Sequence, residues 1–202
     1  MTRALVAMLL FLGLAACSGA GDLDEPPVPL GNFNLVHNIV VAPKPQKGPF
    51  SRDATEEELT GAVRAAIAER FDRYEGSKRY HFGVSVEGYV LAVPGVPLLL
   101  SPKSALILNL TVWDDAAGGK LNTEPKQITV LENIGSGTLI GSGYTLSAEE
   151  QLQQLSQNAA KSIERYLVSQ MTEEGWFDGV DTPAVDLVEP VIAPQDDRVP
   201  AG

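Results

Sequence analysis

The sequence predicts an α+β fold, a two-layer sandwich in which two helices cover one face of a four-stranded mixed sheet. Three observations predict it. Four segments have the alternation or the β-branched composition of strands, and two segments carry one apolar stripe each at helical spacing. Their order along the chain is β-α-β-β-β-α. Because each helix has a single apolar stripe, both are expected to pack against the same face of the sheet.

The first strand and the first helix occupy the beginning of the domain. Residues 33–41 are rich in β-branched residues, but apolar residues occur on both faces, so the inward face is ambiguous. Thr55 and Glu58 form a capping box at the start of the helix, and Gly76 ends its pattern. The expected helical stripe consists of Leu59, Ala62, Val63, Ala66, Ile67 and Phe71, with Arg70 extending beside it towards solvent.

Three further strands and the second helix follow. Residues 79–91 alternate strictly until Gly88 breaks the phase, which predicts a β-bulge. Residues 104–113 and 126–134 are expected to form a hairpin, and the packing residues of the last strand are taken to be Ile128, Val130 and Leu131. Ser147 and Glu150 form a second capping box. The first two strands, which flank a helix, should be parallel, and the later pairs antiparallel.

The first seventeen residues have the layout of a secretory signal. Arg3 gives a positive start, residues 4–14 form an apolar run, and small residues precede Cys17. The run is shorter than the roughly 20 residues that span a bilayer. Cys17 is the only cysteine of the chain, so it has no internal disulfide partner. Cys17 is therefore either an ordinary small residue near a cleavage site or a residue with a chemical role.

The ending Leu14-Ala15-Ala16-Cys17 resembles the lipobox of bacterial lipoproteins. The resemblance implies that the signal is cut before Cys17, that Cys17 carries the acyl chains (palmitate among them), and that the mature chain is anchored to a membrane. Ser18 in place of Asp implies the outer membrane, with the protein on its periplasmic face. Acyl chains contribute about 0.8 kcal/mol per buried CH₂, so several chains anchor a protein stably.

The chain is accordingly divided into four parts. Residues 1–16 are the signal peptide, 17–32 the acylated cysteine with a flexible tether, 33–171 the periplasmic α+β domain, and 172–202 an acidic disordered tail. A tether of this length would reach about 45 Å. The element order of the domain resembles small periplasmic modules of envelope lipoproteins.

Charge is concentrated in the tails. The formal net charge is −11, and residues 33–171 account for −2 of it. A nearly neutral domain with acidic arms lacks the cluster of basic residues that nucleic-acid binding needs, so nucleic acid is excluded as a partner.

Three connections are expected at the end of the sandwich far from the tether, namely residues 42–54, 92–103 and 135–146. The first is basic, the second is apolar and proline-rich, and the third is rich in Gly and Ser. Leu98, Leu99 and Leu100 of the second either plug the open end of the sandwich or contact a partner. The basic residues expected near the Gly-Ser connection are Lys44, Lys47, Arg52 and Lys103.

The sequence shows no recognisable motif for catalysis or for binding a metal or cofactor. The two histidines, His37 and His81, lack the spacing of a zinc site, and no nucleophile elbow is present. The sequence therefore predicts a non-enzymatic accessory or scaffold lipoprotein that docks on another envelope component, without metal or cofactor. The alternative is a periplasmic binding module for a small or anionic ligand, held by the four basic residues.

Overall fold

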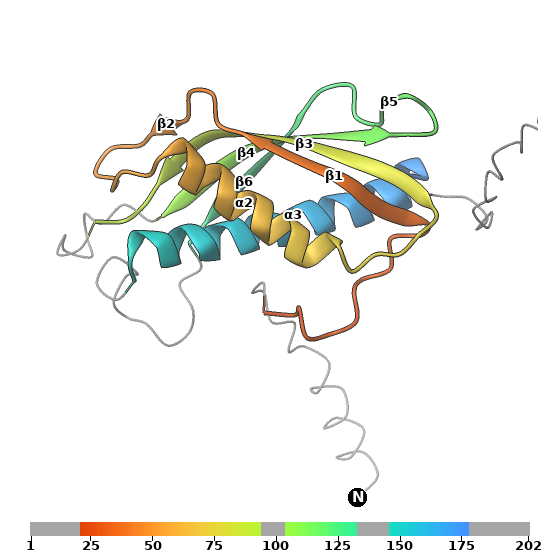
Figure 1. The fold of residues 1–202 in the computed structure, drawn as a ribbon, viewed down its shortest axis with the longest axis horizontal. Coiled ribbons are helices and arrows are strands. Elements are labelled where there is room, and N and C mark those ends of the chain that lie inside the picture. Colours follow the sequence, from red (N-terminus) through yellow and green to blue (C-terminus); the bar gives the residue numbers. More distant parts are fainter. Residues whose placement is uncertain (1–20, 94–103, 133–145, 178–202) are drawn as a thin grey trace, which may run out of the picture.

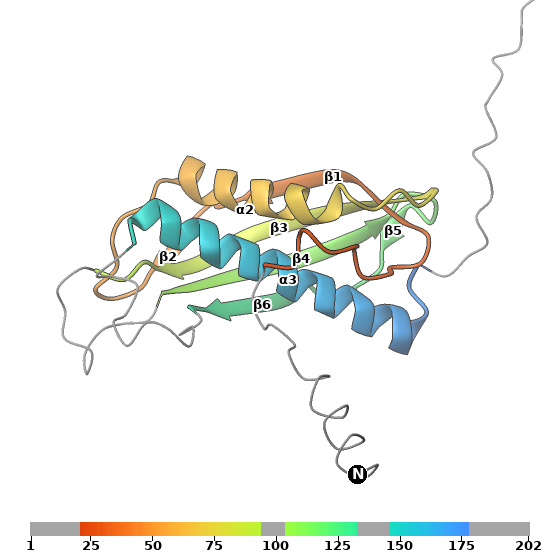
Figure 2. The same cartoon turned by 90° about the horizontal axis from the view of Figure 1, so that it is seen from below.

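The computed structural model describes residues 21–93, 104–132 and 146–177. Its main strands lie in the order β1 (Phe33–Val41), β3 (Lys78–Val90), β4 (Ala105–Asp114) and β6 (Lys126–Leu131). Short strands β2 (Gln46–Lys47) and β5 (Gly119–Lys120) pair with β3 and β4. Helices α2 (Glu56–Phe71) and α3 (Ala148–Glu174) cover one face of the sheet (Figures 1 and 2). The predicted α+β sandwich is confirmed.

The pairing directions are those expected from the connections. β1 pairs with β3 in parallel, and β3–β4 and β4–β6 are antiparallel. A register shift lies between Leu35 and His37 in β1. The shift explains why apolar residues occur on both faces of this strand, because Leu35 is buried before it and Val40 after it. The predicted bulge in β3 is confirmed by the shift between Val86 and Gly88.

The core lies between the sheet and the helices. The inward side chains of the central strands are almost completely buried: Tyr80, Phe82, Val84 and Val86 of β3 and Leu106, Leu108, Leu110 and Val112 of β4. Ile128 and Val130 of β6 are also buried, as predicted, but Leu131 is 56% exposed. The expectation for Leu131 was wrong, because alternation along β6 places it with Thr129 on the opposite face of the sheet.

Both helices begin with the predicted capping boxes. The hydroxyls of Thr55 and Ser147 accept hydrogen bonds from the third residue of each helix, and the glutamates at those positions bond back to the cap. α3 ends at Gly175, whose φ of 68° is the left-handed conformation that suits glycine. The chain then turns back, and the Phe177 ring packs into the core against Phe33 and Tyr80.

Residues 21–32 differ from the predicted flexible tether. They form a segment, called the strap here, that lies on the side of the helices facing away from the sheet (Figures 1 and 2). Leu30 is buried, and the side chain of Asn32 bonds to Ser77 before β3. The strap therefore contributes to the core, although its Gly, Pro and acidic composition is typical of a segment that buries no side chains. Phe177 is also buried in the folded part, whereas the sequence predicts that the acidic tail begins at residue 172.

Candidate functional site

The predicted site residues fall into two groups. Cys17, Leu98, Leu99, Leu100 and Lys103 lie outside the described residues. Lys44, Lys47 and Arg52 lie within them, in the connection between β1 and α2.

Arg52 joins the connections at the end of the sandwich. Its Nε donates to the carbonyl oxygen of Ala92 (2.6 Å), and its Nη2 donates to that of Leu146 (2.9 Å). Ala92 begins the second predicted connection and Leu146 ends the third. Arg52, which belongs to the first, therefore links the ends of all three connections. Because the guanidinium is occupied by backbone carbonyls, the geometry gives Arg52 a structural role.

The lysines do not converge with Arg52 on a common point. Lys47 pairs with Asp53 at 2.6 Å, and this hydrogen bond is the main reason that the pKa of Lys47 is raised. The exposed Lys47–Asp53 pair is screened by solvent and contributes little to stability. Lys44 is exposed. The described part of the predicted anion site is therefore two separate surface lysines and one structural arginine.

Beside these connections, a groove of about 580 Å³ runs along α2 and the first half of α3. Its lining includes small residues such as Gly61, Ala62 and Ala65. Five carboxylates line it, from Asp53, Glu57, Glu58, Glu69 and Glu149, and its described lining holds no basic residue. This charge opposes an anionic ligand in the groove.

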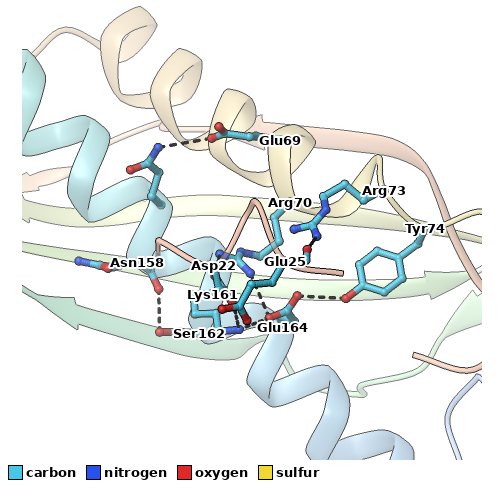
Figure 3. Close-up of polar contacts among 11 residues, drawn as sticks. Asp22, Glu25, Glu69, Arg70, Arg73, Tyr74, Asn158, Lys161, Ser162 and Glu164 are labelled. Atoms are coloured by element: carbon cyan, nitrogen blue, oxygen red, sulfur yellow. Dashed lines mark hydrogen bonds and ion pairs between the residues drawn. The ribbon is translucent and has the colours of Figure 1, made fainter. Parts of the chain in front are cut away.

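A cluster of buried charges, called the clamp here, links the strap to both helices (Figure 3). Arg70 of α2 and Glu164 of α3 are each 2% exposed, and Arg70 Nη1 donates to Glu164 Oε2 at 3.1 Å. Arg70 Nη2 donates to Asp22 Oδ1 at 2.7 Å. Lys161 Nζ donates to both carboxylates, at 2.6 Å to Glu164 and at shorter range to Asp22. Tyr74 completes the clamp by donating its hydroxyl to Glu164 Oε1 at 3.0 Å.

The clamp balances two positive charges with two negative charges. The hydrogen bond from Arg70 holds the pKa of Asp22 well below its usual range, and Lys161 acts in the same direction. Burial raises the pKa of Tyr74, and the neighbouring Glu164 raises it further. Removing one partner from a buried pair typically costs about 3–5 kcal/mol, because the remaining charge is left uncompensated. The stability of the clamp therefore depends on all four of its charged side chains being present.

Sequence reasoning missed the clamp. Asp22 lies in the stretch that the sequence predicts to be a flexible tether, and Arg70 was expected to extend to solvent. The expectation for Arg70 was wrong, because its partners come from α3 and from the strap. A local signal did exist: Lys161 and Glu164 are spaced for one helix face, and Arg70 lies within the apolar stripe of α2.

The second candidate surface is the sheet face that no described helix covers, called the open face here. Four large apolar side chains on it are exposed: Ile39 (59%), Val41 (46%), Trp113 (40%) and Leu131 (56%). Two rows of residues that pair across neighbouring strands cross this face, Ile39–Gly83–Thr111 and Val41–Ser85–Asn109–Gln127. Ile39 and Val41 begin these rows, and the other members are small or neutral. These rows contain no charged residue, in a chain whose net charge is −11.

Both histidines of the chain lie together at one end of the open face. Their rings are 4.8 Å apart, and His81 Nε2 is 3.1 Å from Asp115 Oδ1. The hydrogen bond with His81 is the main reason that the pKa of Asp115 is lowered. Within residues 21–93, 104–132 and 146–177, no group of three or more His, Cys, Asp or Glu side chains is arranged to hold a metal.

The comparisons with known proteins concern the fold. No protein-family model and no curated protein matches this sequence. Similar solved structures include a DUF330 protein of Xanthomonas campestris (15% identity, 74% of this chain and 94% of that chain, TM-score 0.44). A candidate lipoprotein of Caulobacter crescentus is 11% identical over 77% of this chain and 99% of its own (TM-score 0.40). The PelC dodecamer of Paraburkholderia phytofirmans is 10% identical over 69% and 91% (TM-score 0.37).

These TM-scores are below 0.5, so the fold and the sites described above rest on this chain's own residues. In the described part of the chain, none of the helices has the length and hydropathy needed to cross a bilayer.

Proposed function

We propose that this chain is a lipid-anchored lipoprotein of the bacterial envelope, held at the periplasmic face of the outer membrane through Cys17. It acts as a non-enzymatic docking subunit for another envelope protein. The lipobox residues and the single cysteine support the anchor. The observation that supports docking is the open face, where four large apolar side chains are exposed around neutral rows.

The chemistry of the open face defines its partner. Burying a charge without a counter-charge is costly, so the two uncharged rows of this face select a partner surface that is itself apolar and uncharged where it covers them. Four strands about 4.8 Å apart and roughly eight residues long give an area of about 500 Å². A standard interface buries about 800 Å² on each partner. The predicted contact residues Leu98, Leu99 and Leu100, which lie outside the described residues, would add to this area if they contact the partner and do not plug the core.

The docking proposal is tested by capture of cross-linked partners from solubilised envelopes, followed by mass spectrometry. The wild-type chain is compared with Ile39→Ser/Leu131→Ser on the open face and with Gln154→Ser on the exposed surface of α3 as the control. We expect one dominant protein that is retained by the wild type and the control and lost by the double variant. That protein, once purified, should bind the wild-type chain directly.

Two results would redirect the proposal. Equal capture by all three chains would exclude the open face as the docking surface. A co-purifying small molecule in place of a protein would favour the ligand-binding alternative. The anchor is tested separately, because the Cys17→Ser chain should lose both acylation and membrane fractionation.

A further inference from the structure

The strap makes a continuous series of contacts with the helical layer. Asp22 enters the clamp, the carbonyl oxygen of Glu25 accepts a hydrogen bond from Arg73, and that of Val28 lies 2.9 Å from the Tyr74 hydroxyl oxygen, whose one hydrogen is shared between Val28 and Glu164. Leu30 is buried at the end of the strap. These contacts fix the path of the chain from residue 22 to β1.

The side of the domain on which the strap lies is also fixed. Asp22 contacts Arg70 from α2 and Lys161 from α3, and Figure 3 shows it between the two helices. Figures 1 and 2 place the strap beyond the helices, on the side opposite the open face of the sheet. The strap therefore enters the domain from its helical side.

Covalent geometry limits how far the anchor can lie from this entry point. Five residue steps separate Cys17 from Asp22, and an extended chain spans about 3.3–3.6 Å per residue, which gives about 17 Å at most. Without the clamp and the remaining strap contacts, the free length would extend to β1, and the reach would be about 45 Å.

We propose that the clamp orients the domain on the membrane, with the helical side towards the lipid surface and the open face pointing away from it. This inference rests on the proposed lipid anchor. The clamp holds Asp22 on the helical side, and the short chain before it brings that side to within about 17 Å of the acylated residue. The open face is then presented to partners in the periplasm.

The inference is tested with the acylated full chain in vesicles of phosphatidylethanolamine with phosphatidylglycerol as the anionic lipid. One donor dye is attached either at Arg165→Cys, on the same face of α3 as Lys161, or at Thr129→Cys, on the open face. The dye is selective because Cys17 is the only native cysteine and, in the proposed anchor, its thiol carries an acyl chain. Energy transfer to an acceptor dye on the lipid headgroups reports the height of each label.

We expect greater transfer from residue 165 than from residue 129. Two variants should reduce transfer from residue 165, and the second of them should also remove the difference between the two labels. Asp22→Asn weakens the clamp, and a ten-residue Gly-Ser insertion after Ala20 adds about 17 Å of flexible reach while leaving the fold intact. Asp24→Asn is the matched control, because Asp24 is an exposed acid in the same strap. It should preserve the difference.

The outcomes separate this inference from the proposed anchor. Equal transfer from both labels in a vesicle-bound wild-type chain, or greater transfer from residue 129, would overturn the orientation and leave the anchor in place. Retention of the difference in the insertion variant would also overturn it, because the short reach would then not be its cause. Vesicle binding by Cys17→Ser equal to that of wild type would overturn the anchor itself.

Discussion

Replacing Asp22 by Asn tests the clamp most directly, because the change removes one charge and preserves the shape of the side chain. Asp22 accepts from Arg70 and from Lys161, and its side chain is 25% exposed. A hydrogen bond to a charged group contributes about 1.5–3 kcal/mol. Arg70 and Lys161 both keep Glu164 as a partner, and part of Asp22 is in contact with water. We therefore expect a loss of about 2 kcal/mol in the free energy of unfolding.

The assay is thermal and urea unfolding of the mature chain, carrying Cys17→Ser for solubility, followed by circular dichroism at pH 7. For a chain of this size a loss of about 2 kcal/mol lowers Tm by about 4–8 °C. Asp24→Asn carries the same charge change in the same strap and should remain within about 0.5 kcal/mol of the parent. Equal effects of the two substitutions would refute the reasoning, since the loss would then reflect net charge and not the clamp.

The difference in the free energy of unfolding between wild type and Asp22→Asn also depends on pH. The pKa of Asp22 is depressed in the folded chain. Its contribution is therefore complete above the unfolded pKa of about 3.9 and is lost as the pH falls towards the lower, folded value. Unfolding measured from pH 7 down to pH 2.5 should show the two chains converging below about pH 4. A difference that stays constant over this range would mean that the Asp22 charge is not its source.

The remaining predictions concern packing and helix ends, all measured by urea unfolding. Phe177→Ala should cost about 3–5 kcal/mol, because the ring fills the core beside Phe33 and Tyr80. Gly175→Ala should cost about 1–2 kcal/mol because φ is 68°, and Gly83→Ala, whose added Cβ meets open space, should be neutral or stabilising. Thr55→Ala should cost about 1 kcal/mol through loss of its cap, and Thr60→Ala on the same helix serves as the comparison.

Local patterns predicted the secondary structure because its causes are local. A capping box needs two residues three positions apart, so Thr55 with Glu58 was visible in the sequence. The alternation of residues along β4 predicted which of its side chains are buried, because successive side chains of a strand point to opposite faces of the sheet. Leu131 was assigned wrongly because it follows Val130 directly, and adjacent strand residues cannot both face the core.

The clamp was not predictable in this way, because its partners are distant in sequence. Asp22 is 48 residues from Arg70 and 139 residues from Lys161. No periodicity spans such separations, so an acid in a Pro- and Gly-rich stretch is indistinguishable from a solvated one. The boundary near residue 171 failed for a related reason. Gly175 does end α3, but the chain then folds back and buries Phe177.

The clamp and Phe177 also define a mechanical path through the molecule. Lys161, which binds Asp22, lies on α3, and the same helix leads to Phe177 at the start of the C-terminal segment. A tension applied between the two chain ends would therefore be transmitted along the axis of α3. Phe177 also contacts Phe33 of β1 and Tyr80 of β3, so the aromatic core beside these two strands would carry part of the same load.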